Sequence, residues 1–231
     1  MTADSGPTEF PRPDLLPERL ADWITDEIVN GRFAPGERLV EQSLSKRCNV
    51  SRVPLREALR IVAGRGLLTI EPHRGAVVTP LSEDELNDLF GLRLALEGFA
   101  AAAVAMANPR PDLSSLHRLN AEMENCIAAG DIDAYNNVAN AFHGAIVTAA
   151  GNGLLRDAYD RVKARFRRYQ TVMANIPHLP PRSVSEHEQI LVAMENGDAS
   201  AARDLAEGHI RDLVAAYRDT AQDRDLFTKA S

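Results

Sequence analysis

The chain has 231 residues, of which 45% are hydrophobic and only 5% aromatic, and it carries a net charge of -7. This length allows one large or two small domains with proper cores, and a Leu- and Ala-rich composition favours helices over sheets. We expect no membrane span and no secretion signal, because no apolar run approaches about 20 residues and residues 1–13 lack a basic start and a hydrophobic stretch. Residues 1–13 are therefore predicted to be a flexible arm, Cys48 and Cys126 reduced thiols, and the chain cytoplasmic.

Net acidity argues against a nucleic-acid ligand, but the charges are unevenly distributed. Residues 11–80 hold 11 basic and 9 acidic side chains, whereas residues 81–231 hold 15 and 22. Within residues 46–74 there are seven basic side chains and two acidic ones. The positive charge is therefore local to the first third of the chain.

The first third predicts three short helices followed by a hairpin. Apolar residues at helical spacing indicate a helix over 15–30 that ends at Gly31, and FAPGERL is expected to be a turn. A second helix is predicted over 40–48 and a third over 52–64, with Ser51 as its N-cap and Pro54 in its first turn. The β-prone runs LLTI and GAVV, joined by EPHR, indicate a short hairpin.

After Pro80 the pattern is helical throughout. Ser82 and Glu85 form a capping box, and segments separated by Gly- or Pro-containing breaks predict six helices. These helices are expected over 83–106, 112–129, 131–150, 153–175, 183–196 and 198–221. The predicted fold is mainly α, with an N-terminal domain over 14–80 and an antiparallel helical bundle over 81–231.

The order helix, tight turn, helix and hairpin is that of a winged helix-turn-helix, whose second helix enters the DNA major groove. Arg52 and Arg56 would project from the start of that helix, with Leu55 and Leu59 packing on the opposite face. The alternative is a solvated stripe of arginines paired with Glu57.

Three histidines lie inside predicted bundle helices. His187 and His209 flank the Asn196–Asp198 turn, so two antiparallel helices would bring them to within about one 5.4 Å helical pitch of the same height. His143 can come from a third helix. Converging imidazoles suit Zn²⁺ or Ni²⁺ with open positions left over, whereas the alternative is three separate core histidines.

The segment LVEQSLSKRCNVSRVPLREALRIVAGRGLLTIEPHRGAVV resembles the DNA-binding domain of GntR-type bacterial transcription regulators of the FadR-like subfamily. The resemblance implies DNA contacts from the second helix, the recognition helix and the wing, and it leaves the operator sequence open. The implied residues are Gln42, Ser51, Arg52, Val53, Arg56, His73, Arg74 and Gly75, with Arg60 and Arg65 as weaker candidates.

The segments LFGLRLALEGFAA, ANAFHGAIVTAAGN and SEHEQILVAMENGDASAARDLAEGHI resemble the helical FCD effector domain, in its VanR-like branch. The resemblance implies a metal on His143, His187 and His209, with an Asp or Asn one turn before the first histidine. Here that position is Ala139, so the alternatives are three histidines with water, a weak site or no metal. It also implies that Arg93 points into the cavity and binds an anionic effector, the alternative being a surface ion pair with Glu97. Of the basic run over 161–170, one arginine is expected at most to reach the pocket.

These features predict a homodimeric transcription regulator, a repressor, that binds an inverted-repeat operator and responds to a small organic or sugar acid. One alternative is a metal-dependent enzyme that uses the three histidines. No motif for a general base accompanies the histidines, and an enzyme would leave the N-terminal domain unexplained. A second alternative is an architectural DNA binder without an effector.

Overall fold

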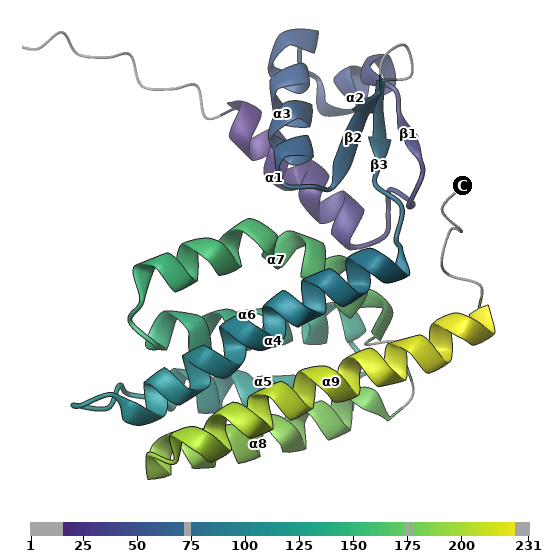
Figure 1. The fold of residues 1–231 in the computed structure, drawn as a ribbon. Helices are drawn as coiled ribbons and strands as arrows, with labels where there is room; N and C mark the ends of the chain where they lie inside the picture. The colour runs from purple at the N-terminus through teal and green to yellow at the C-terminus, as the bar shows by residue number, and fades with distance from the viewer. Residues whose placement is uncertain (1–15, 72–74, 174–175, 177, 225–231) are drawn as a thin grey trace, which may run out of the picture.

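The structure, a computed structural model, describes residues 16–71, 75–173, 176 and 178–224, and gives no side-chain description at 170–173 or 220–224. It consists of an N-terminal unit of three helices and a small sheet, placed on one side of a bundle of six helices (Figure 1). The helices are α1 (Leu16–Val29), α2 (Glu41–Cys48), α3 (Arg52–Gly64), α4 (Glu83–Met106), α5 (Ser114–Ala129), α6 (Ile132–Ala149), α7 (Gly153–Met173), α8 (Leu179–Asn196) and α9 (Ala199–Arg224), and the strands are β1 (Arg38–Leu39), β2 (Leu68–Glu71) and β3 (Gly75–Val78). The predicted mainly α fold with a winged helix-turn-helix is confirmed.

The sheet contains one strand more than the predicted hairpin. β2 and β3 pair antiparallel, and β1 pairs with the other edge of β3, so that Leu39 lies opposite Ala76. β1 lies in the segment predicted to be only a turn. Gly36 adopts a left-handed conformation with φ of 80° and donates its N–H to the Val78 carbonyl, which directs the following residues along β3.

The tight turn between α2 and α3 depends on Asn49, which adopts a left-handed φ of 51°. Its N–H bonds to the Lys46 carbonyl, and the Ser45 hydroxyl donates to the Val50 carbonyl. Asparagine tolerates this conformation better than other side chains, so the turn stops α2 and starts α3 within a few residues. Ser51 has the extended backbone of an N-cap, although its side chain makes no capping hydrogen bond.

α4 is the central helix of the bundle and packs against α6, α7, α8 and α9. The helix is long and apolar enough to cross a membrane by length and composition, which the expectation of no long apolar run overlooked. Half of that stretch is buried in the bundle, where Arg93 and Glu97 form a buried ion pair. A helix that packs against several others is apolar on its buried side, which accounts for the buried half of this stretch.

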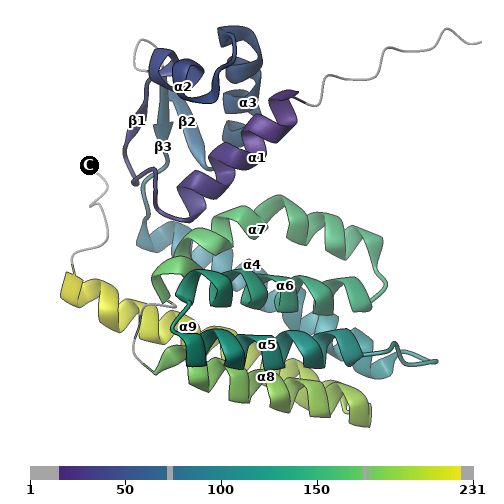
Figure 2. The ribbon, with the colours of Figure 1, turned by 180° about the vertical axis from the view of Figure 1, so that it is seen from behind.

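The remaining bundle helices lie within a few residues of their predicted positions. α8 differs most, because it begins at Leu179 and not at residue 183. Pro180 and Pro181 occupy its first turn, where a missing N–H removes no helical hydrogen bond. Viewed from behind, α5, α6 and α8 form the face opposite α4 (Figure 2).

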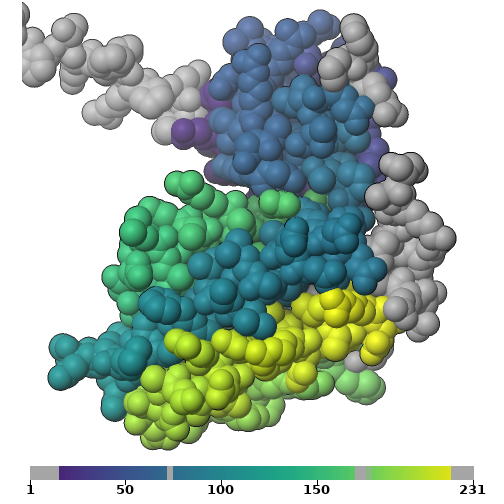
Figure 3. All heavy atoms as spheres, viewed as in Figure 1, coloured from purple at the N-terminus to yellow at the C-terminus, as the bar shows by residue number. Residues whose placement is uncertain are grey.

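The N-terminal unit contacts the bundle through α7, which runs beneath α1 (Figures 1 and 3). Ala164 packs against the core of the N-terminal unit, and Arg167 pairs with Asp26 of α1 at 3.4 Å. The side chain of Arg165 lies against Gly66, where a Cβ atom would come within 2.9 Å of it. α7 is therefore a shared wall between the two units.

Candidate nucleic-acid interface and metal centre

The start of α3 presents the predicted DNA-contacting side chains to solvent. Ser51, Arg52 and Val53 are exposed, with Val53 at 79%, and Gln42 is exposed on α2. Leu55 and Leu59 are buried on the opposite face of α3, as predicted. The N-terminal turn of α3 is therefore open to solvent and can enter a DNA groove.

The arginines of α3 differ in their partners. Arg56 is held by Glu41 of α2, with Nε at 2.9 Å from Oε2, whereas Arg52 makes no ion pair within the described residues. Arg65 bonds Asp22 and Thr25 of α1 and so ties the end of α3 to the N-terminal unit. Of the wing residues, Gly75 begins β3 with φ of 81°, and His73 and Arg74 lie outside the described residues.

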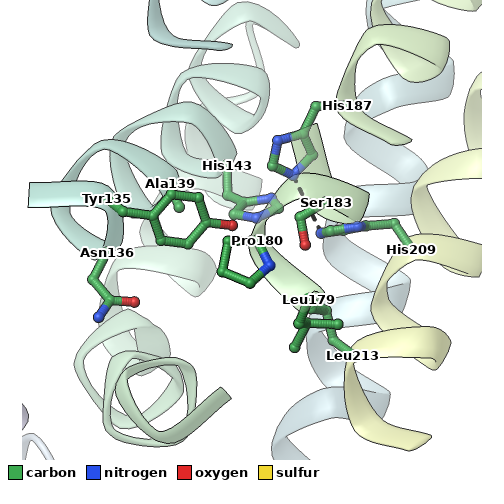
Figure 4. A pocket seen from close by; sticks show the side chains of 10 residues that line it. All are labelled: Tyr135, Asn136, Ala139, His143, Leu179, Pro180, Ser183, His187, His209 and Leu213. Atoms are coloured by element: carbon green, nitrogen blue, oxygen red, sulfur yellow. Dashed lines mark hydrogen bonds between the residues drawn. The ribbon is translucent and has the colours of Figure 1, made fainter. Parts of the chain in front are cut away.

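The bundle brings His143 of α6, His187 of α8 and His209 of α9 together, as their spacing predicted (Figure 4). One potential ligand atom from each lies within 4.8 Å of the others, and the Nε2 atoms of His187 and His209 are 3.3 Å apart. All three side chains are buried. Three imidazoles that converge in this way can hold one metal ion.

Two carboxylates orient two of these rings. Glu97 Oε2 lies 2.9 Å from His143 Nδ1, and Glu186 Oε2 lies 2.7 Å from His209 Nδ1. Each carboxylate accepts a hydrogen bond from Nδ1 and leaves Nε2 as the nitrogen for a metal, which is the arrangement usual behind zinc ligands. In this structure Nε2 of His209 lies at hydrogen-bond distance from Nε2 of His187. The ring of His187 is fixed by stacking on Phe142 at 4.3 Å between ring centroids.

Burial sets the charge of the site. Desolvation lowers the pKa of His143 to about 4 even though Glu97 raises it, and desolvation also lowers the pKa of His187. Burial alone would raise the pKa of Glu97, but Arg93 and His143 outweigh it and lower that pKa to about 2. Imidazole nitrogens backed by carboxylates are a donor set that suits a divalent metal, so these residues fit a metal ion.

The histidines form one wall of a cavity of about 30 Å³, enough for about one water molecule (Figure 4). Apart from the histidines, its lining is uncharged in the described structure. The lining residues are Tyr135, Asn136, Ala139, His143, Leu179, Pro180, Ser183, His187, His209 and Leu213. Ala139, one turn before His143, therefore faces the site, and Asn136 also lines the cavity.

Arg93 lies behind this wall and is absent from the described lining. Its Nε donates to Glu97 Oε1 at 2.6 Å, and its guanidinium lies over the rings of Phe90 and Phe166. The ion pair with Glu97 is fully buried, whereas the alternative drawn from the sequence placed it at the surface. A direct contact between Arg93 and an effector would require Arg93 to leave Glu97.

Sequence reasoning missed Glu186 and the second role of Glu97. Glu186 directly precedes a histidine, yet it orients His209 on another helix and not its neighbour. Sequence reasoning also missed the contacts made by the basic run over 161–170. The described arginines of this run are absent from the pocket lining. Arg165, Arg167 and Arg168 instead contact Glu85, Asp26 and Thr79, respectively.

Two family models match the chain. The model "Bacterial regulatory proteins, gntR family" matches residues 16–78, and the model "FCD domain" matches residues 88–212. The chain belongs to the GntR family of bacterial regulators and carries an FCD domain.

Known relatives of this GntR regulator are similar over most of their length. The probable D-xylose utilization operon transcriptional repressor of Paenarthrobacter nicotinovorans is 30% identical over 86% of this chain and 85% of its own. The transcriptional repressor RspR of Escherichia coli K12 is 26% identical over 88% and 90%. The chain is accordingly a transcription regulator and not an enzyme.

Solved structures support the same fold for this GntR regulator. A putative GntR regulator from Rhodococcus sp. RHA1 has a TM-score of 0.75 at 26% identity and covers 88% of this chain and 97% of its own. The Escherichia coli McbR/YncC structure has a TM-score of 0.76 over 89% and 98%, and its 20% identity supports the fold alone.

Proposed function

We propose that this regulator is a repressor whose affinity for its operator is controlled by a divalent metal and a small carboxylate in the FCD domain. The observation that carries the proposal is the group of His143, His187 and His209 beside a cavity, with two of the rings oriented by carboxylates. The proposal of repression is supported by relatives whose names describe them as repressors.

In this proposal the metal is Zn²⁺, Ni²⁺ or a similar ion held by His143, His187 and His209. When bound, it supplies a Lewis acid that attracts an oxygen anion to the cavity. The chain itself supplies three imidazole nitrogens, excludes bulk water by burial and fixes two rings through Glu97 and Glu186. The cavity as described holds about one water molecule, so in this proposal the lining opens to admit a compact organic or sugar acid.

The DNA-binding part of the proposal rests on the first turn of α3. Ser51, Arg52, Val53 and Arg56 are exposed there, and Gln42 is exposed on α2. We propose that these residues, with Gly75 and the wing residues His73 and Arg74, contact the operator. A homodimer bound to an inverted repeat satisfies the two-fold symmetry of such an operator. In this proposal the protein acts in the cytoplasm, where bacterial DNA lies.

Two measurements on the purified full-length protein test this function. Elemental analysis after metal-replete purification should find one divalent ion per chain. Calorimetry with a panel of carboxylates should then find a ligand that binds the metal-loaded protein and not the chelator-treated protein, and that changes its affinity for DNA. An absence of metal in the loaded protein would overturn the metal-dependent part. Retention of metal without any response of DNA binding would instead favour the architectural DNA binder.

A further inference from the structure

The segment that joins the two units is held by α7. Arg168 donates a hydrogen bond to the Thr79 carbonyl, and Arg165 pairs with Glu85 Oε1 through Nη2 at 2.7 Å and Nε at 2.9 Å. The Tyr169 hydroxyl lies 3.1 Å from the Ser82 carbonyl oxygen and 2.8 Å from Glu85 Oε2. Residues Arg165, Arg168 and Tyr169 are called the linker clamp below. They fix the chain at the point where β3 passes into α4.

The linker clamp contacts aromatic side chains that pack against Arg93, next to the histidine site. Tyr169 meets Phe90 edge to face, with ring centroids 6.1 Å apart. The guanidinium of Arg93 lies 5.7 Å from the ring centroid of Phe90 and 5.9 Å from that of Phe166, which stands on α7 between members of the clamp. Arg93 in turn pairs with Glu97. The contacts are continuous from His143, a proposed metal ligand, to the linker.

Glu97 joins Arg93 to the histidine site, because each of its two oxygens bonds one of them. One oxygen accepts from Arg93 at 2.6 Å, and the other accepts from His143 Nδ1 at 2.9 Å. A metal ion held by His143 would make its Nδ1–H a stronger donor and would strengthen the bond from Nδ1 to Glu97. The two terminal nitrogens of Arg93 have no hydrogen-bond partner in the described structure. Arg93 is therefore held by Glu97 and two aromatic rings, and a change at Glu97 reaches those rings.

We propose that the linker clamp transmits occupancy of the histidine site to the N-terminal unit, with the Arg93–Glu97 pair as its connection to the metal ligands. Arg93 then acts as a positioning residue for His143 and Tyr169. The inference rests on the proposed function, since it requires that the site takes a metal and that the N-terminal unit binds DNA. The metal must also favour one arrangement of the linker, because a ligand with no preference shifts nothing.

Tyr169→Phe and Arg165→Met test the clamp, and Arg156→Met is the matched control. Tyr169→Phe keeps the ring and removes the hydroxyl, whereas Arg156 is an exposed arginine on the same helix that pairs with Asp160. The probes are Zn²⁺ alone, a chelator, and a DNA duplex selected from a random pool by the wild-type protein. Zn²⁺ should change wild-type affinity for this DNA by about fivefold or more, the lower range of typical couplings.

In both clamp variants that response should fall to about twofold or less while Zn²⁺ affinity stays within about twofold of wild type, because neither side chain touches the histidines. The control should respond like the wild type. Arg93→Lys keeps the charge beside Glu97 but not the planar group over the rings, and it should lower the response with Zn²⁺ still bound.

A full wild-type response in both clamp variants would overturn the proposal. A wild type that binds both Zn²⁺ and DNA without any change in DNA affinity would overturn it too, and would leave the metal and DNA sites of the proposed function standing. A wild type that fails to bind Zn²⁺ would remove the metal part of the proposed function together with this inference.

Discussion

Glu97 and Glu186 accept hydrogen bonds from the Nδ1 atoms of His143 and His209, and this selects the nitrogen that each ring offers to a metal. His187 lacks such a carboxylate and is fixed by the ring of Phe142. The three histidine rings are therefore held in place by different contacts. Removing these supporting contacts should therefore weaken metal binding to different extents.

Removal of one carboxylate should weaken the metal site without destroying it. Glu186→Ala should lower Zn²⁺ affinity by about 10- to 100-fold, the usual effect of losing a group that orients a histidine ligand. His209→Ala or His187→Ala removes a ligand outright and should abolish retention. Competition with a chromophoric chelator measures both effects. His117→Ala, on the surface beside Glu195, is the control and should leave Zn²⁺ affinity unchanged. The site would be contradicted if Glu186→Ala, His187→Ala and His209→Ala also kept the wild-type Zn²⁺ affinity.

Ala139 lines the cavity one helical turn before His143. A carboxylate at this position can reach the same ion as His143, so Ala139→Asp should tighten Zn²⁺ binding, by about tenfold for about 1.4 kcal/mol of added binding free energy. The same chelator competition measures it. Asn140→Asp, one position further along the helix, is the matched control and should have a smaller effect. A weaker site in Ala139→Asp would show that the carboxylate does not reach the metal.

At the scale of elements, helical periodicity and capping residues were sufficient to predict each helix of the described residues and the hairpin. β1 was missed because its two residues owe their strand geometry to pairing with β3 and not to their own pattern. The beginning of α8 was placed too late because two prolines suggested a break, although they are compatible with a first turn. The meeting of His187 and His209 could be predicted from their spacing across a turn, with His143 expected from a third helix. Their carboxylate partners could not, because they depend on the rotation of α4 and α8.

The two arginines at the start of α3 should contribute differently to DNA binding. Arg52 is unpaired within the described residues and can meet a base directly, so Arg52→Ala should cost about 1–3 kcal/mol and relax preference at one base pair. Arg56 must first leave Glu41, with which it is paired at 2.9 Å. Glu41→Gln should therefore raise operator affinity, since it weakens that competing pair.

Fluorescence anisotropy with the selected duplex and with single-base variants measures these effects. Lys46→Ala is the control for a contact with phosphate alone, and it should weaken all sequences alike and lower the salt dependence by about one unit of slope. Equal affinities for the wild type and Arg52→Ala would contradict the assignment of α3 as the recognition helix.

At the scale of the whole molecule, α4 exposes an uncharged face. Leu92, Phe99 and Met106 are 41%, 43% and 64% exposed and follow one another at intervals of seven residues. The only charged residues between Leu89 and Met106, Arg93 and Glu97, point into the bundle. An apolar seam at this spacing is typical of helix-to-helix packing, and a two-fold axis beside Phe99 would set Leu92 of one chain near Met106 of another.

This face predicts the dimer contact. Leu92→Glu or Phe99→Glu should convert a dimer into monomers, because each places a charge inside the buried seam. Sedimentation velocity at several concentrations measures the change, with circular dichroism to verify that the variants fold. Leu154→Glu, at an apolar residue on α7 that is 83% exposed, is the control and should leave the dimer intact. A dimer that persists in both seam variants would place the contact elsewhere.

The position of α7 between the two units has a consequence for engineering. Hybrid sensors can be built from GntR regulators by fusing the DNA-binding unit of one protein to the effector domain of another. A junction at residue 80 would follow the boundary of the sequence families, yet it would separate Asp26 from Arg167 and Gly66 from Arg165, which face one another across the units. In a better hybrid, the α7 residues that face the N-terminal unit are exchanged together with that unit, so that the native contacts between α1 and α7 are kept. The DNA binding of such a hybrid should still respond to the ligand of its effector domain. A hybrid cut by domain boundary alone should bind DNA and ignore its signal.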